Sequence, residues 1–84
     1  MDRKVKLYAL STCGWCKKTA EWLSDKDISS DRIYVDKLHG AEREDVLDEM
    51  KEFNPRRSFP TVVIDDGKTV IIGFKPEELE RELI

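Results

Sequence analysis

Both cysteines of this 84-residue chain lie in one short segment, Cys13-Gly14-Trp15-Cys16. The segment stands between an apolar run, residues 4–10, that is typical of a β-strand and a run, residues 17–26, that is typical of a helix. A helix that begins at this junction places its positive end beside the first thiol and favours the thiolate there. Two thiols so spaced at a strand-to-helix junction therefore indicate redox chemistry.

Length and charge narrow the class of protein further. Residues 1–84 suffice for a single domain with one modest core, and they carry 15 basic and 18 acidic side chains, a net charge of −3. This balance argues against binding to nucleic acid. No apolar run reaches the ~20 residues that cross a bilayer, and no signal peptide is recognisable. We therefore expect a monomeric cytoplasmic protein without membrane contact, a setting in which a disulfide is more often catalytic than structural.

The periodicity of the chain predicts the element order β-α-β-α-β-β-α. The expected strands are residues 4–10, 32–36, 61–64 and 68–72, and the expected helices are residues 17–26, 41–53 and the segment from Pro76 onward. Ser11 and Thr12 offer hydroxyls that could cap the first helix, and Asp66-Gly67 predicts a two-residue hairpin turn. A right-handed crossover makes the first two strands parallel. The fold class is therefore α/β, with a mixed four-stranded sheet flanked by helices and the first strand in its interior.

At three places the chain resembles the glutaredoxins, which have the thioredoxin-like fold. These are Cys13-Gly14-Trp15-Cys16 after the first strand, Phe59-Pro60-Thr61 before the third strand and Gly73 after the fourth. The resemblance covers nearly the whole chain. It implies a dithiol–disulfide oxidoreductase in which Cys13 is the exposed nucleophile, Cys16 is the resolving thiol and Pro60 is a cis-proline that faces them. It also implies that no bound cofactor is required.

The same cysteines are compatible with a second class of protein, a metal or iron–sulfur carrier. Zinc usually takes four ligands in a structural site. The chain has one histidine, His39, and no second cysteine pair, so an intrachain zinc site would need His39 and a carboxylate. Some relatives of the resembled family hold a cluster between two subunits. Redox catalysis without a metal is the favoured interpretation, and the carrier remains the alternative.

Several residues near these motifs are candidates for contacts with the substrate. They are Thr12, Trp15, Phe59, Pro60, Thr61, Gly73, Phe74 and Lys75. Four basic residues, Lys17, Lys18, Arg56 and Arg57, are expected to form a rim that attracts an anionic thiol or an acidic protein surface. Ordinary solvated charges are the alternative for this rim. Trp15 has two open interpretations, a platform for a partner or a partly buried aromatic residue.

The segment after the fourth strand departs from the pattern of glutathione-dependent relatives. Phe74 stands where they have a second glycine, and Pro76 stands where an acidic residue helps to hold glutathione. Gly14-Trp15 also replaces their Pro-Tyr pair. The string from Gly73 to Pro76 is similar to that of glutaredoxin-like proteins that donate electrons to ribonucleotide reductase. This similarity implies disulfide-containing proteins as substrates. It also makes a thioredoxin-type reductase, ribonucleotide reductase or a small anionic thiol more plausible partners than glutathione.

Overall fold

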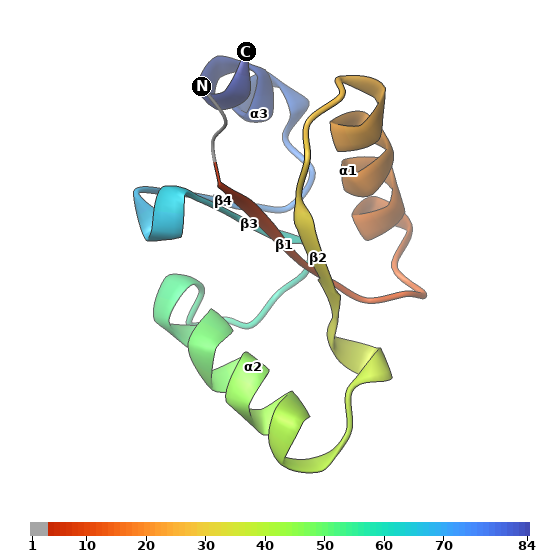
Figure 1. Cartoon of the computed structure of the whole chain (residues 1–84), viewed down its shortest axis with the longest axis vertical. Helices are drawn as coiled ribbons and strands as arrows, with labels where there is room; N and C mark the ends of the chain where they lie inside the picture. Colours follow the sequence, from red (N-terminus) through yellow and green to blue (C-terminus); the bar gives the residue numbers. More distant parts are fainter. Residues whose placement is uncertain (1–3) are drawn as a thin grey trace.

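The computed structural model describes residues 4–84, which form a four-stranded mixed sheet with three α-helices (Figure 1). The strands are β1 (Val5–Ala9), β2 (Asp31–Tyr34), β3 (Thr61–Ile64) and β4 (Thr69–Ile72). The α-helices are α1 (Gly14–Asp25), α2 (Gly40–Phe53) and α3 (Pro76–Leu83), and two short 3-10 helices are η1 (Val35–Lys37) and η2 (Asp65–Gly67). The predicted order of strands and α-helices is confirmed.

The first strand lies inside the sheet, whose strand order is β2-β1-β3-β4. It pairs in parallel with β2, where Leu7 lies opposite Arg32, and antiparallel with β3, where Leu7 lies opposite Val62. Both faces of an interior strand are covered, which explains why Leu7 and its neighbour Tyr8 are both fully buried. The loop that carries the cysteines therefore begins at the middle of the sheet.

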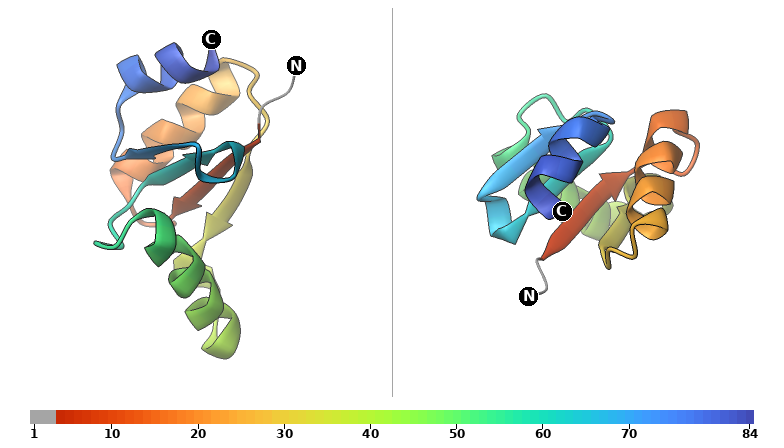
Figure 2. Two further views of the ribbon diagram at one scale, coloured as in Figure 1. Left: turned by 90° about the vertical axis from the view of Figure 1, so that its left-hand side faces the viewer. Right: turned by 90° about the horizontal axis from the view of Figure 1, so that it is seen from above.

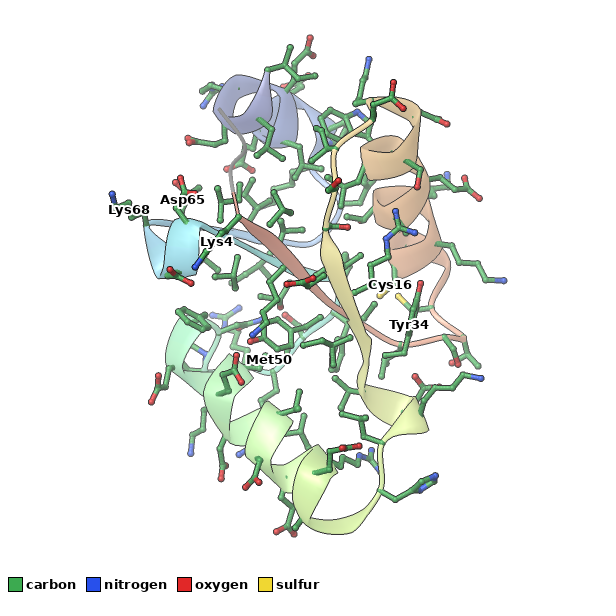
Figure 3. The ribbon with its side chains drawn as sticks, viewed as in Figure 1. Lys4, Cys16, Tyr34, Met50, Asp65 and Lys68 are labelled. Carbon is green, nitrogen blue, oxygen red and sulfur yellow. The ribbon has the colours of Figure 1, made fainter. Side chains whose placement is uncertain are left out.

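The helices form a layer on each side of the sheet: α1 and α3 cover one face, and α2 covers the other (Figures 1 and 2). The core is divided accordingly. The larger part, under α1 and α3, contains Leu7, Cys16, Leu23, Val62, Ile64 and Leu79, and the smaller part, under α2, contains Tyr8, Met50 and Val63. Figure 3 shows Cys16 and Met50 on these opposite sides of the sheet.

The start of α1 differs from the prediction. The helix begins at Gly14, and Cys13 is its N-cap because the Sγ atom of Cys13 accepts a hydrogen bond from the Cys16 N–H. Ser11 and Thr12 were expected to supply the cap, and this expectation is wrong. The Ser11 hydroxyl instead donates to Asp36 of η1, and the formation of η1 also ends β2 at Tyr34, two residues earlier than predicted.

The connection between β3 and β4 also differs from the prediction, since it is not a two-residue turn. Ile64 pairs with Thr69, so residues 65–68 connect the strands. The Asp65 N–H donates to the Lys4 carbonyl at 2.8 Å and is thereby directed toward β1 rather than toward Lys68. Gly67 has φ +105°, and a Cβ atom there would lie 2.6 Å from the Phe53 ring, so the position needs glycine for two reasons.

Helix α2 is attached to the sheet by Glu49 as well as by apolar contacts. Its Oε1 atom accepts hydrogen bonds from Lys6 Nζ at 2.6 Å and from the Tyr8 hydroxyl at 2.7 Å. The bond from Lys6, followed by that from Tyr8, holds the pKa of Glu49 below its usual range. Burial of Tyr8 raises the pKa of its hydroxyl, so it remains a hydrogen-bond donor.

Because the folded protein lowers the pKa of Glu49, its contribution to stability is present above the unfolded value and is lost as pH falls. Glu49→Gln should lower the free energy of unfolding at pH 7 by ~0.5–1 kcal/mol, a small effect because the pair is partly exposed. The deficit should shrink between pH 7 and pH 3 in urea unfolding experiments. Glu52→Gln, an exposed position on the same helix, is the control. A deficit that is unchanged at pH 3 would contradict this assignment.

Candidate active site

A tight turn after β1 presents Cys13. The Cys13 N–H donates to the Leu10 carbonyl at 3.2 Å, and the extended backbone of Cys13 (φ −90°, ψ 120°) directs its side chain back over the first turn of α1. There the Sγ atom lies 3.2 Å from the Cys16 backbone nitrogen. A helix N-terminus offers N–H groups and a positive end to a negative group, and Cys13 Sγ occupies that position.

The second thiol has the opposite environment. Cys16 is 1% exposed and packs in the core beneath α1, whereas Cys13 is partly exposed, and both thiols are free in the structure. Burial, followed by the hydrogen bond to Cys13, raises the pKa of Cys16 to about 12. The site therefore pairs an accessible thiol at a helix start with a buried thiol that keeps its proton at neutral pH.

Two more of the predicted motifs meet beside these thiols. The Phe59–Pro60 peptide bond is cis, as expected, and the Gly73 N–H donates to the Pro60 carbonyl at 2.8 Å. Phe59, Phe74 and Cys13 all pack against the same core cluster, the one that contains Cys16. The segments before β3 and after β4 are thus joined to each other and lie next to the cysteine loop.

An aromatic contact connects the start of α1 with the segment after β4. The rings of Trp15 and Phe74 are stacked, with centroids 6.2 Å apart and planes inclined by 27°. The Lys18 ammonium lies 5.1 Å from the centroid of the Trp15 ring. Trp15 is nevertheless 59% exposed, so it presents much of its ring to solvent two residues from Cys13. Trp15 is therefore an exposed residue, and its role as a platform for a partner remains a prediction.

Asn54, the residue that follows α2, supports the loop before Pro60. It is fully buried, and its Nδ2 atom donates to Ser58 and, at 3.0 Å, to the Thr61 hydroxyl. Its Oδ1 atom accepts the Arg56 N–H at 3.1 Å. The signal in the sequence was the Asn-Pro pair, which indicates a turn but not which groups the amide will bond.

The remaining predicted site residues lie around these segments with different exposure. Thr12 is exposed in the turn before Cys13, whereas Thr61 is fully buried, and its hydroxyl donates to the Ser58 carbonyl. Lys75 precedes α3 and forms an exposed ion pair with Glu78 at 3.6 Å. The four basic residues of the predicted rim, Lys17, Lys18, Arg56 and Arg57, are all exposed, on α1 and in the loop after α2. Their attraction for an anionic partner remains a prediction.

Across residues 4–84, no three side chains of histidine, cysteine, aspartate or glutamate are grouped so that they could hold a metal ion. None of the helices in this range is long and apolar enough to cross a membrane.

The fold and the paired thiols define a thioredoxin-like redox domain. The sequence profile of the family described as glutaredoxin matches residues 5–70, most of the chain. The chain therefore belongs to the glutaredoxin family.

Individual proteins that resemble this chain in sequence or structure belong to the same family or are described as similar to it. The chain is 32% identical over 77 residues to a glutaredoxin-like 8.6 kDa protein in the rubredoxin operon of Clostridium pasteurianum, an alignment that covers 92% of this chain and 93% of that protein. It is 30% identical over 77 residues to the glutaredoxin-like protein NrdH of Lactococcus lactis, with coverage of 92% and 96%. The crystal structure of a glutaredoxin from Methanosarcina mazei matches with a TM-score of 0.87 and 48% identity, covering 95% of this chain and 77% of that chain.

The environments of the two thiols predict selective alkylation. Because burial raises the pKa of Cys16 to about 12, its thiol stays protonated at pH 8. We expect iodoacetamide at pH 8 to add one label to the reduced native protein, at Cys13, and a second label only after denaturation. Peptide mass spectrometry identifies the labelled residue, and the Cys13→Ser variant, which should resist labelling when folded, is the control. Labelling of native Cys16 as fast as Cys13 would contradict the proposed asymmetry.

Proposed function

We propose that this protein is a dithiol–disulfide oxidoreductase that reduces disulfides in proteins or small molecules and acts as a glutaredoxin-like electron carrier. One observation carries the proposal: Cys13 Sγ lies at the N-terminus of α1, one helical turn before the buried thiol of Cys16. Membership of the glutaredoxin family supports it.

The first step is an attack by the Cys13 thiolate on one sulfur of the substrate disulfide. The S–S bond of the substrate breaks, its second sulfur leaves as a thiolate and takes up a proton, and a mixed disulfide joins Cys13 to the substrate. The partial exposure of Cys13 permits this approach. Cys16 does not compete as the attacking group, because its thiol is buried and protonated.

The second step releases the substrate. Cys16 loses its proton and attacks the Cys13 sulfur, so a Cys13–Cys16 disulfide forms and the bond to the substrate breaks. The substrate sulfur that leaves takes up a proton. The substrate has gained two electrons from the two protein sulfurs and two protons, one that balances the proton lost by Cys16 and one from solvent, because Cys13 starts as a thiolate. A thiolate stabilised at a helix start is also a good leaving group when the donor later reduces Cys13.

Both electrons come from the two thiols, so the reaction requires no bound cofactor, only a donor that restores the dithiol. We propose a cytoplasmic protein whose partners are disulfide-containing proteins, with ribonucleotide reductase as a candidate substrate. The match to the glutaredoxin-like protein NrdH supports this assignment, together with the Gly73-to-Pro76 string.

We propose further that glutathione is a poor donor compared with a thioredoxin-type reductase or another anionic thiol. Phe74 stacks on Trp15 beside Cys13, where a glycine would let the backbone of a bound tripeptide approach. Pro76 is the first residue of α3 and offers neither a carboxylate nor an N–H. Lys75 is the one basic residue between Gly73 and Pro76, and it forms an ion pair with Glu78.

Single replacements should distinguish the two thiols. Cys13→Ser should abolish disulfide reduction, because Cys16 is too buried to replace it as the nucleophile. Cys16→Ser should accumulate mixed disulfides with protein substrates, which non-reducing gels and mass spectrometry detect. Equal loss of activity without a trapped adduct from Cys16→Ser would reject the assigned roles. Visible absorbance after anaerobic purification, lost in both variants, would instead favour an iron–sulfur carrier.

Donor preference is tested with the oxidised protein and each donor in turn. One missing charge-assisted hydrogen bond costs ~1.5–3 kcal/mol, or ~10- to 150-fold in affinity, so turnover with glutathione and its reductase should be correspondingly weak. Phe74→Gly combined with Pro76→Asp should raise the glutathione-dependent rate while leaving Cys13 and Cys16 in place. Ile84→Gly, a change at an exposed apolar position at the chain end, is the control. Saturable, efficient turnover of the unmodified protein with millimolar glutathione would refute the donor assignment.

A further inference from the structure

Asp36, which lies in η1, accepts two hydrogen bonds from the turn before Cys13. The Ser11 N–H donates to Asp36 Oδ1 at 2.9 Å, and the Ser11 hydroxyl donates to Asp36 Oδ2. These two residues are 25 positions apart in the chain. They meet because β1 and β2 are parallel, so the loop after β1 and the η1 helix after β2 lie at the same end of the sheet (Figure 1).

The position of Ser11 connects this contact to the thiols. Ser11 lies inside the turn closed by the hydrogen bond from the Cys13 N–H to the Leu10 carbonyl. A shift of Ser11 would therefore move Cys13, whose side chain must stay over the first turn of α1 to accept the Cys16 N–H. The hydrogen bonds from Ser11, that of its side chain first, hold the pKa of Asp36 below its usual range, so the carboxylate is charged at neutral pH.

We propose that Asp36 is a positioning residue that fixes the turn of residues 10–13 through Ser11 and so holds the Cys13 thiol at the N-terminus of α1. Asp36 acts through hydrogen bonds made by Ser11 rather than by contact with the reacting sulfur. This role applies to the reactivity of Cys13 toward any reagent and does not depend on the natural substrate.

The negative charge of Asp36 has a second, opposing effect on the same site. Asp36 adds one of the smaller contributions to the raised pKa of Cys16, after burial and the bond to Cys13. Removal of the charge alone, with the hydrogen bonds kept, should therefore not decrease the reactivity of Cys13. Removal of the hydrogen bonds should decrease it, because the cap at Cys13 loosens. Comparison of Asp36→Asn with Asp36→Ala separates the two effects.

The experiment measures the rate at which iodoacetamide alkylates Cys13 in the reduced, folded protein at neutral pH. Asp36→Asn keeps an oxygen that accepts the Ser11 N–H and an amide that can bond its hydroxyl, so its rate should equal or exceed that of the unmodified protein. Asp36→Ala removes both bonds, and its rate should fall ~5- to 10-fold, with a smaller fall of ~2- to 3-fold in Ser11→Ala. Adding Ser11→Ala to Asp36→Ala should cause no further loss, because the two side chains act as one unit.

Asp45→Ala, which changes an exposed aspartate on α2, is the matched control and should leave the rate unchanged. If Asp36→Ala does not fold, Ser11→Ala and Asp36→Asn still decide the question, since a loss in the first without a loss in the second supports the proposal. An Asp36→Ala rate that rises with that of Asp36→Asn would show an effect of charge alone and overturn it. Unchanged rates in Ser11→Ala and Asp36→Ala would also overturn it. Absence of disulfide reductase activity in the unmodified protein would refute the proposed function and leave this alkylation test intact.

Discussion

The hydrogen bond from the Cys16 N–H to Cys13 Sγ is the interaction on which the rest of the site depends. It makes one side chain both the N-cap of α1 and the candidate nucleophile, and the first turn of the helix contains no acidic residue that would serve instead. The same N–H groups that a helix leaves unpaired at its start are those that stabilise a sulfur anion. The start of α1 and the position of the Cys13 thiol therefore depend on the same hydrogen bond, and a shift of the turn before Cys13 would affect both.

The asymmetry of the two thiols follows from the layered fold. Helix α1 lies flat on the sheet, so a residue three positions after the cap faces inward, and Cys16 becomes part of the core with Leu7 and Leu23. Cys13 lies at the edge of this core, where the helix begins, and is partly exposed. Burial then keeps the proton on one thiol and leaves the other accessible, an asymmetry that would order the two steps of the proposed exchange without a separate general base.

The segments before β3 and after β4 are the candidates for selecting a partner at the thiols. The loop before β3 is fixed by the buried amide of Asn54, and the segment after β4 is tied to Pro60 by the Gly73 N–H. Phe74 then reaches the exposed ring of Trp15. A partner that approaches Cys13 would meet this aromatic pair, of which Trp15 belongs to the Cys13–Cys16 segment and Phe74 lies outside it.

The sequence by itself determined the element order, the interior place of β1, the end of α2 at residue 53 and the place of the candidate site, because these depend on local periodicity, on proline and glycine and on the spacing of two cysteines. The structure alone decided that Ser11 bonds to Asp36 rather than capping α1, that Trp15 stacks on Phe74, and that four residues connect β3 with β4. Each of these depends on groups far apart in the chain that compete for the same hydrogen bond or surface. Hydroxyls such as that of Ser11 can satisfy a helix end or a distant carboxylate equally well, and only the parallel pairing of β1 with β2, which sets Asp36 beside the turn, selects between them.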